Sequence, residues 1–315
     1  MLQLLRQYKW FYSLYNLWHP RLLKHNLEVY KKIGLKKNYF SPISSLDFKG
    51  KVLPEPPVPP LDQRLADTAV WPLLSNETRQ ALLDFDHQGF AILPSYFSGE
   101  QVDLANQEVQ RLEESGKGKF NAAGKMMFAF HQSEHLAHMG GHTHMIELLS
   151  ALMGREAVLF QSINFLKGSQ QPTHSDSIHM TTFPLGNLIA IWVALEDIQP
   201  GSGELHYYPG SHRLPYYMNA DYDNEGTRWK IGPKPYTAYE AMLAEKIQAF
   251  GLTKHRFLPK KGDVLIWHAN LLHGGEPVTE PLASRKSVVY HYFGKGVVCY
   301  HEITQRPALI GKTTV

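Results

Sequence analysis

The order of apolar and polar positions divides the chain into a helical first part and a strand-rich second part. Near the start, large apolar residues recur at helical spacing until Pro20 ends the pattern: Leu4, Tyr8, Phe11, Tyr15 and Trp18. Residues 90–93 alternate like a short strand, and Ser98 with Gln101 forms a capping-box pattern in front of a second helix. Residues 145–154 predict another helix that ends at Gly154.

Beyond residue 154 the pattern changes to short β-rich runs separated by Gly and Pro. These runs are residues 157–166, 187–195, 204–211, 263–275 and 287–298. Several short strands with turn signals between them predict a sandwich or a barrel. The fold class is therefore mainly β with flanking helices (α+β).

An insertion at about 215–257 interrupts the strand-rich part. Thr237 with Glu240 resembles a capping box, and Gly251 is a plausible stop, so we expect one inserted helix. Insertions in β folds commonly cover a site, so the segment is interpreted as a lid.

The first 52 residues form a basic amphipathic arm. Residues 1–51 carry ten Lys or Arg against two Asp or Glu, whereas the remaining chain has 22 against 27. Two interpretations remain: a helix docked on its own domain or on a partner subunit, which we favour, and contact with a membrane surface. Residues 53–63 are a Pro-rich linker, and residues 64–315 form the main domain.

Composition excludes some classes of protein. Apolar residues make up 43% of the chain, as in ordinary globular proteins, and a net charge of +3 gives no argument for nucleic acid binding. The single cysteine, Cys299, cannot form an internal disulfide, and no apolar run approaches the roughly 18 residues needed to span a bilayer. The start also lacks a secretory cleavage pattern, so we expect a cytoplasmic protein, with membrane association as the alternative.

The candidate chemistry begins at His174 and Asp176. On a strand, two residues two apart share a face and can hold one ion, although such a triplet is more often a solvated turn. A third ligand is available in His273, 97 residues after Asp176 at the end of an apolar run. Two imidazoles and one carboxylate leave open positions on a metal, which suits iron(II) and oxygen.

A second pair follows on the next predicted strand. Arg285 and Ser287 are two apart and therefore on one face. An arginine fork with a hydroxyl suits a carboxylate, because two parallel charge-assisted hydrogen bonds fix its geometry. A surface ion pair is the alternative for Arg285.

Several segments together resemble the phytanoyl-CoA dioxygenase family of iron(II)- and 2-oxoglutarate-dependent oxygenases. They are "THSDS", "IWVALEDIQPGSGELHYYPGSHR", "GDVLIWHANLLHGG" and "RKS", within a resemblance that runs from about Leu82 to Phe293. It implies a double-stranded β-helix (jelly roll, cupin-like). It also implies that His174, Asp176 and His273 bind iron and that Arg285, assisted by Ser287, binds the distal carboxylate of 2-oxoglutarate.

The same resemblance implies weaker assignments. Gln161, Asn164 and Lys167 lie in a strand from which such enzymes often contact the co-substrate, and Trp192 is a further lining residue. Gly275 stands where many relatives have a serine, which removes one hydrogen bond to the co-substrate. We interpret the other nearby histidines as structural; they are His179, His206, His268 and His291. A weak alternative is that His212 and Arg213 contact the substrate.

The expected function is hydroxylation of an aliphatic carbon of a small-molecule or lipid-like substrate, with O2 as co-substrate and release of succinate and CO2. The alternatives are a cupin-like metal-dependent isomerase, which has no need for Arg285 and Ser287, and a non-catalytic binding protein on the same fold.

Overall fold

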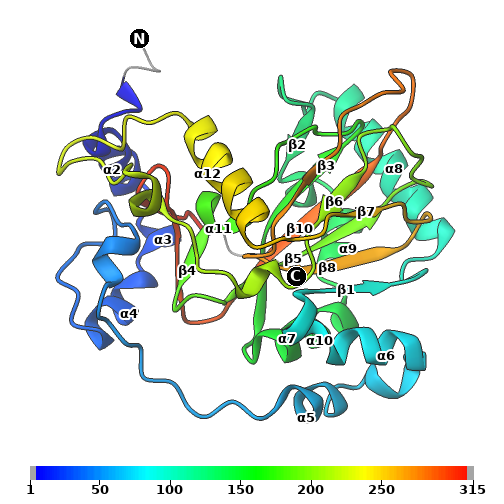
Figure 1. The fold of residues 1–315 in the computed structure, drawn as a ribbon, viewed down its shortest axis with the longest axis horizontal. Coiled ribbons are helices and arrows are strands. Elements are labelled where there is room, and N and C mark those ends of the chain that lie inside the picture. Colours follow the sequence, from blue (N-terminus) through cyan, green and yellow to red (C-terminus); the bar gives the residue numbers. More distant parts are fainter. Residues whose placement is uncertain (1–4, 311–315) are drawn as a thin grey trace.

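A six-stranded antiparallel sheet forms the centre of the molecule, in a computed structural model that describes residues 5–310 (Figure 1). In spatial order its strands are β1 (Phe90–Leu93), β8 (Val264–His268), β5 (Leu188–Ala194), β10 (Ser287–Gly294), β3 (Ala157–Phe165) and β2 (Lys125–Met127). Every residue of β5 and β10 is buried, because both faces of these central strands are covered. Such strands show continuous apolar runs instead of alternation.

Helices cover one face of this sheet. They are α5 (Leu61–Ala66), α6 (Asn76–Leu83), α7 (Phe85–Gln88), α8 (Gly99–Glu114), α9 (Glu134–Gly140) and α10 (Thr143–Met153). The expected capping box of Ser98 and Gln101 begins α8, and Gly154 ends α10 in the left-handed conformation, which confirms both signals. Two tyrosines of β10 fasten α9, since Tyr290 and Tyr292 donate to backbone carbonyls of Leu136 and Gly140.

The opposite face packs against a small sheet of β7 (His255–Phe257), β6 (Leu205–Tyr207) and β9 (His273–Gly275). Apolar side chains fill the space between the two sheets, among them Phe165, Trp192, Leu205 and Trp267. Two antiparallel sheets facing one another, with helices outside, confirm the expected mainly β architecture with flanking helices.

A third sheet joins the N-terminal arm to the domain. Its strands are β12 (Arg306–Pro307), β11 (Val298–His301) and β4 (Thr181–Phe183), and the arm contains α2 (Lys9–Leu17), α3 (Pro20–Leu23) and α4 (Asn26–Lys32). Phe48 of the arm stacks on Phe183 with ring centroids 4.3 Å apart. Ser45 donates its backbone N–H and hydroxyl to the buried carboxylate of Glu302 at 2.9 and 2.8 Å. The arm thus packs on its own chain.

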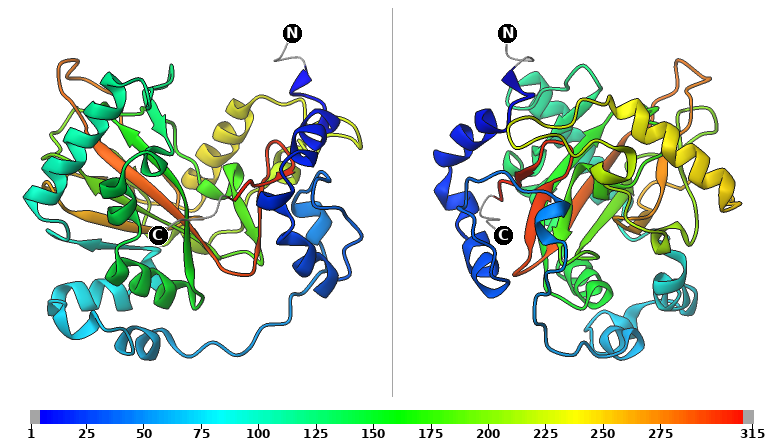
Figure 2. Two further views of the ribbon diagram at one scale, coloured as in Figure 1. Left: turned by 180° about the vertical axis from the view of Figure 1, so that it is seen from behind. Right: turned by 60° about the vertical axis from the view of Figure 1, so that its left-hand side comes forward.

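Residues 51–60 form neither helix nor strand as the chain passes from the arm to α5 (Figure 2). Residues 61–63, which the composition placed in the linker, instead open α5, because the helix begins directly after Pro60. Among the described residues there is no helix with both the length and the apolar character that crossing a bilayer requires.

The insertion holds α12 (Tyr236–Ala249), and Pro235 occupies its N-cap. The expected Thr237 capping box is wrong, because Thr237 lies inside the first turn. Burial sets the start of this helix instead, since Tyr239 is fully buried and half-buried Tyr236 packs beside it. The remaining short helices are α11 (Asp176–His179), η1 (Ser45–Phe48), η2 (Trp71–Leu73), η3 (Ala129–His131), η4 (Ser211–Arg213) and η5 (Asn219–Tyr222).

Candidate functional site

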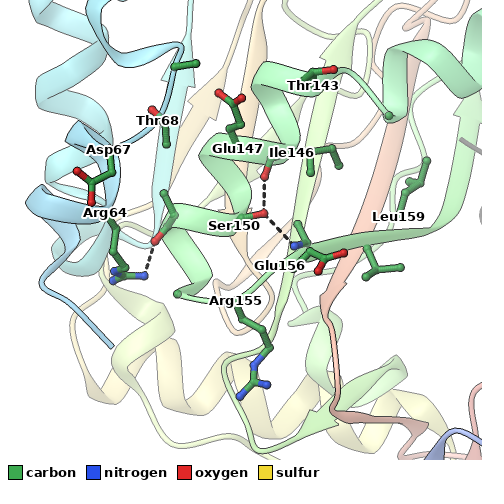
Figure 3. A pocket seen from close by; sticks show the side chains of 16 residues that line it. Arg64, Asp67, Thr68, Thr143, Ile146, Glu147, Ser150, Arg155, Glu156 and Leu159 are labelled. Carbon is green, nitrogen blue, oxygen red and sulfur yellow. Dashed lines mark hydrogen bonds between the residues drawn. The ribbon is translucent and has the colours of Figure 1, made fainter. Parts of the chain in front are cut away.

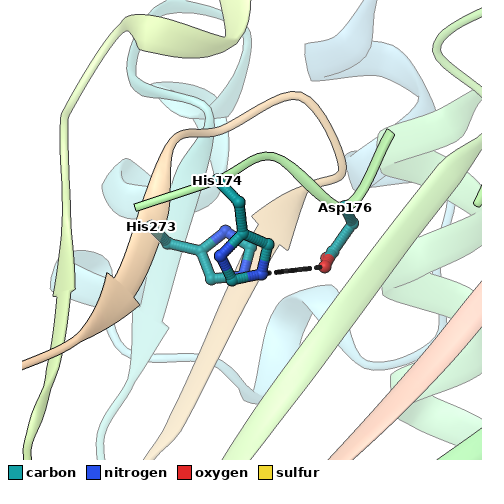
Figure 4. Close-up of side chains that lie close together, drawn as sticks. All are labelled: His174, Asp176 and His273. Atoms are coloured by element: carbon teal, nitrogen blue, oxygen red, sulfur yellow. Dashed lines mark ion pairs between the residues drawn. The ribbon is translucent and has the colours of Figure 1, made fainter. Parts of the chain in front are cut away.

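His174, Asp176 and His273 lie together in the space between the facing sheets (Figure 4). One ligand atom from each residue falls within 4.8 Å of the others. Nε2 of His273 is 3.7 Å and Nε2 of His174 is 4.0 Å from Oδ1 of Asp176. Among the described residues this is the one group of three or more His, Cys, Asp or Glu side chains arranged to hold a metal ion.

Backbone pairing sets the separation of the two histidines. His174 and His273 form an isolated antiparallel bridge in which each N–H donates to the other's carbonyl at 2.9 Å. Asp176 is not on the same strand, as the spacing suggested, but is the first residue of the one-turn helix α11. The turn of that helix, closed by the Met180 N–H on the Asp176 carbonyl, brings the carboxylate back towards the histidines.

Both imidazoles are held in the form that binds metals. Nδ1 of His174 lies 2.8 Å from the carbonyl of Pro172, and Nδ1 of His273 lies 3.0 Å from that of Leu271. An Nδ1–H that donates to a carbonyl leaves the Nε2 lone pair free for a ligand bond. Burial, with the nearby His273 and His179, holds the pKa of His174 well below its ordinary value, so its imidazole is neutral.

Asp176 has two partners that the sequence did not single out. Trp267 donates its indole N–H to Oδ2 at 2.8 Å, and Nε2 of His291 lies 3.6 Å from the same oxygen. Burial alone would raise the pKa of Asp176, but the neighbouring His273 and His291 hold it well below its ordinary value. The carboxylate is therefore ionised and oriented. His291 is thus part of the site's surroundings, although it had been interpreted as structural.

Arg285 lines the same small cavity of about 80 Å³ as the triad. Its side chain is 3% exposed, and its guanidinium lies over the rings of Phe165 and Trp192, 5.2 and 5.6 Å from their centroids. It donates to the hydroxyl of Ser287 at 3.5 Å, while its Nε has no partner. Burial lowers the pKa of Arg285 to about 10, so the group stays cationic at neutral pH.

The structure separates the other candidates on β3 and beyond it. Gln161 lines a second cavity beside the triad. Asn164 lies on the opposite face, where its strand partners Met126 and Val288 belong to the core under the helices. Lys167 follows the end of β3 and is exposed. Neither Asn164 nor Lys167 lines the two cavities at the triad.

The second cavity, of about 210 Å³, adjoins the triad on the side away from Arg285. Besides Gln161 it is lined by residues that include Lys125, His179, Met180, Leu188 and His301. Burial lowers the pKa of His179 to about 4 and that of His301 to about 3, so both imidazoles are neutral.

Three contacts hold the segments around this cavity together. Lys125 of β2 donates to the Gln171 side chain at 2.9 Å, a pair that spans both cavities and that the sequence did not reveal. Tyr236 of α12 lies 3.0 Å from Nε2 of His179, and the hydroxyl of Tyr239 lies 3.2 Å from that of Ser175. The inserted helix therefore packs directly on the segment that carries two of the three ligands.

Gly275 is explained by close approach of the backbone. A Cβ at this position would lie 2.9 Å from the backbone nitrogen of Gln170 and 3.0 Å from the Ser169 hydroxyl. A serine here would crowd the loop that leads to His174.

Three other histidines are held away from the triad by their own contacts. His206 pairs with Glu276 at 2.8 Å and with the Thr173 hydroxyl at 2.8 Å. The ring of His268 lies 5.4 Å from that of His212, which also contacts the Asp86 carbonyl, while Arg213 bonds His87. None of these histidines, nor Arg213, lines the two cavities at the triad.

A larger surface cavity of about 1000 Å³ lies between α5, α10 and the start of β3 (Figure 3). Its lining mixes the opposite charges of Arg64, Asp67, Glu147 and Arg155. It contains none of the residues that the sequence analysis assigned to the site.

Solved structures of other proteins share this fold. The α-ketoglutarate-dependent carbocyclase SnoK from nogalamycin biosynthesis superposes with a TM-score of 0.58 at 17% identity, covering 79% of this chain and 91% of its own. Apo EctD from S. alaskensis gives a TM-score of 0.54 at 20% identity, covering 76% and 86%. Such similarity confirms the expected jelly-roll fold.

Sequence comparison identifies the family. Ectoine dioxygenase of Nocardia farcinica is 28% identical over 229 residues, which are 66% of this chain and 74% of that protein. Phytanoyl-CoA dioxygenase domain-containing protein 1 of Bos taurus is 26% identical over 175 residues, 53% of this chain and 56% of its own. The sequence model of phytanoyl-CoA dioxygenase (PhyH) matches residues 85–287, more than half of the chain. The protein therefore belongs to the phytanoyl-CoA dioxygenase family.

Proposed function

We propose that this protein is an iron(II)- and 2-oxoglutarate-dependent dioxygenase that hydroxylates an aliphatic carbon of a small molecule and releases succinate and CO2. The donor set fits iron(II), because two imidazoles whose Nδ1 atoms face backbone carbonyls and an ionised carboxylate converge from one side and leave the other positions open. An iron(II) ion held by His174, Asp176 and His273 supplies, with the co-substrate and O2, the oxidising power for this chemistry.

The observation that carries the proposal is the unpaired charge of Arg285. Among the described residues it forms no ion pair, its Nε has no hydrogen-bond partner, and it is 3% exposed. Burying a cation without a partner is costly, so such a group is typical of a site for an anion. Because Arg285 and the triad line one cavity, a dicarboxylate that reaches the metal with one end meets the guanidinium with the other.

The neighbours of Arg285 support this co-substrate site. We infer that Ser287, whose hydroxyl lies 3.5 Å from the Arg285 guanidinium, assists it in binding the same distal carboxylate. The rings of Phe165 and Trp192 flank the guanidinium and exclude water from it. Exclusion of water strengthens the interaction between the arginine and a carboxylate. A cupin-like isomerase would have no use for this arrangement.

We assign the substrate to the second cavity, on the side of the triad away from Arg285. Its size of about 210 Å³ and its mixed lining of Gln161, His179, His301, Met180 and Leu188 favour a compact molecule that offers hydrogen-bonding groups. A long acyl chain would have to extend beyond it. Asp176 fills an anionic ligand position, which favours hydroxylation over transfer of a halide to the substrate.

An anaerobic titration with iron(II) and 2-oxoglutarate tests the co-substrate site. Their chelation gives a weak visible charge-transfer band, which we expect in the native protein only when both are added. Arg285→Gln should weaken 2-oxoglutarate binding by about 10- to 100-fold, the value of charge-assisted hydrogen bonds. Lys295→Gln, which changes an exposed cation paired with Glu156, is the matched control and should leave the titration unchanged.

Two further outcomes separate the alternatives. If no band forms at saturating iron(II) and 2-oxoglutarate, the isomerase or the binding protein becomes the better proposal. If the band forms, compact polar molecules are screened for succinate release and a product one oxygen atom heavier. Succinate release coupled to ring closure or epimerisation without added oxygen would contradict hydroxylation.

A further inference from the structure

The outward face of α2 is apolar and has no partner among the described residues. Four large side chains at helical spacing form this face and are 44%, 52%, 43% and 82% exposed, in the order Trp10, Leu14, Leu17 and Trp18. The opposite face is docked: Asn16 is buried, and Arg306 lies 5.3 Å from the centroid of the Tyr12 ring. The helix is therefore fixed to the domain with its apolar stripe turned outward, at one edge of the molecule (Figure 2).

A loop from the insertion extends this surface. Lys9 donates its N–H to the carbonyl of Trp229 at 2.9 Å, and Ile231 donates to that of Gln7 at 3.0 Å. Trp229 is 62% exposed and borders the same surface groove as Trp10. Two segments more than two hundred residues apart in sequence thus place tryptophans on one face. We call Trp10, Leu14, Leu17, Trp18 and Trp229 the aromatic face.

Exposed cations occur in the same segments as the aromatic face. Within a few positions of its residues in the chain are Arg6, Arg21, Lys24, Arg228 and Lys230. Between residues 5 and 27 there is no acidic residue, and Glu28 is neutralised by Lys32 at 2.8 Å. In the adjoining loop Asp223 pairs with Lys234 and Asp221 accepts the Met218 N–H, which leaves Glu225. Asp47, in the groove beside Trp10, pairs with Lys37. The face is therefore basic at its rim.

This charge decides between occupants. A two-fold contact with a second copy would place the basic rim against itself, which is repulsive. Tryptophan beside arginine and lysine is the composition of surfaces that lie in the interface of an anionic bilayer, where the indole enters the headgroup region and the cations meet lipid phosphates. We propose that the aromatic face docks the protein peripherally on an anionic lipid bilayer.

The docking surface is coupled to the proposed substrate cavity. Tyr236, seven positions after Trp229 in the chain, has a hydroxyl that contacts His179 at the cavity wall. A bilayer at the aromatic face would therefore hold the insertion close to the membrane. This placement is independent of whether the chemistry proposed above is correct.

Cosedimentation of the full-length protein with vesicles tests the proposal. Vesicles of phosphatidylcholine and phosphatidylglycerol in equal amounts should bind the native protein and shift its tryptophan emission to the blue. Vesicles of phosphatidylcholine alone should not bind the protein, and added salt should weaken its binding to the anionic vesicles. The charge reversal Arg21→Glu with Lys24→Glu should reduce binding by about 30-fold, and Leu14→Ser with Trp18→Ser should also reduce it.

Matched controls use equally exposed residues elsewhere. Leu73 and Leu282 are 71% and 102% exposed, and their double change to serine should leave vesicle binding intact. Lys260→Glu with Lys295→Glu controls for the charge reversal. Binding that survives both changes to the aromatic face, or that is equal on neutral vesicles, overturns the proposal. So does a dimer in solution that the Leu14→Ser, Trp18→Ser variant dissociates. The visible band with iron(II) and 2-oxoglutarate should be unaffected in every variant.

Discussion

Trp267 donates its indole N–H to Asp176 Oδ2 at 2.8 Å and so fixes the one carboxylate of the triad. The two residues are 91 positions apart in the chain, and the strand pairing of β8 with β5 and β1 brings the indole between the sheets. With Oδ2 committed to this bond, Oδ1 is the oxygen that faces His174 and His273.

Removing this bond should weaken metal binding without unfolding the protein. Trp267→Phe keeps an aromatic ring in the core but leaves Oδ2 without its donor. Loss of a residue that orients a ligand typically costs 10- to 100-fold in metal affinity, and we expect an effect of about that size for iron(II) or a manganese substitute. Trp71→Phe, at a tryptophan packed under the helices, is the control. Equal affinities in the two variants would show that the indole does not orient the ligand.

Replacing Arg285 should not destabilise the protein when no co-substrate is bound, because the native guanidinium is then a buried charge without a carboxylate partner. Arg285→Met removes a buried charge without a carboxylate partner and keeps most of the volume, so the free energy of unfolding should stay level or rise by up to about 4 kcal/mol. Arg155→Met is the contrast, because Arg155 forms an ion pair with Glu55 and a bond with Asn187, and should destabilise. Urea unfolding of both variants without ligand measures this. A clear loss of stability in Arg285→Met would contradict an unsatisfied charge.

Gly275→Ser should disturb the loop beside His174. The new Cβ would lie 2.9 Å from a backbone nitrogen, so Gln170 must shift, which costs about 1–3 kcal/mol of stability. Metal affinity should fall as well, since β9 carries His273. Gly99→Ser is the control, because the nearest atom to a Cβ there is 3.9 Å away. Thermal unfolding and metal titration of both variants measure these effects. If Gly275→Ser and Gly99→Ser behaved alike, the serine at position 275 would be tolerated and the prediction would be wrong.

His268 should make stability depend on pH. Burial lowers its pKa to about 3 from an ordinary value of 6.5. Between these values the unfolded chain binds a proton that the folded protein does not, so stability is full above pH 6.5 and is lost as the pH falls. At pH 5 the loss from this group reaches up to about 2 kcal/mol. His268→Asn keeps an acceptor for the Asn270 N–H but does not titrate, and should flatten this part of the profile.

The comparison with native protein isolates this group from other buried histidines such as His301. Urea unfolding at pH 7.5 and pH 5 gives the difference for each protein. Identical differences in the two proteins would mean that His268 takes up its proton in the folded state.

The sequence predicted those elements that are apolar on both faces, and the residues whose chemistry is rare. β5 and most of β8 appear as continuous apolar runs, β3 and β10 as β-rich runs, and the pairing of two histidines with a carboxylate led to the triad. It did not predict β2, a three-residue edge strand without alternation, and so it missed Lys125. Gln161 and Asn164 are three apart and therefore lie on opposite faces of β3. Which of the two faces the cavity is set by the pairing of β3 with β10, which no local pattern contains.

The pairing of β6 with β7 brings the two ends of the inserted segment together. Tyr207 and His255 are direct partners across these strands, so the 47 intervening residues leave and rejoin the sheet at the same point. The bridge between His174 and His273 lies outside that excursion. A replacement segment of other length or sequence could therefore be grafted between Tyr207 and His255 to alter substrate choice, while the spacing of the two histidines is retained.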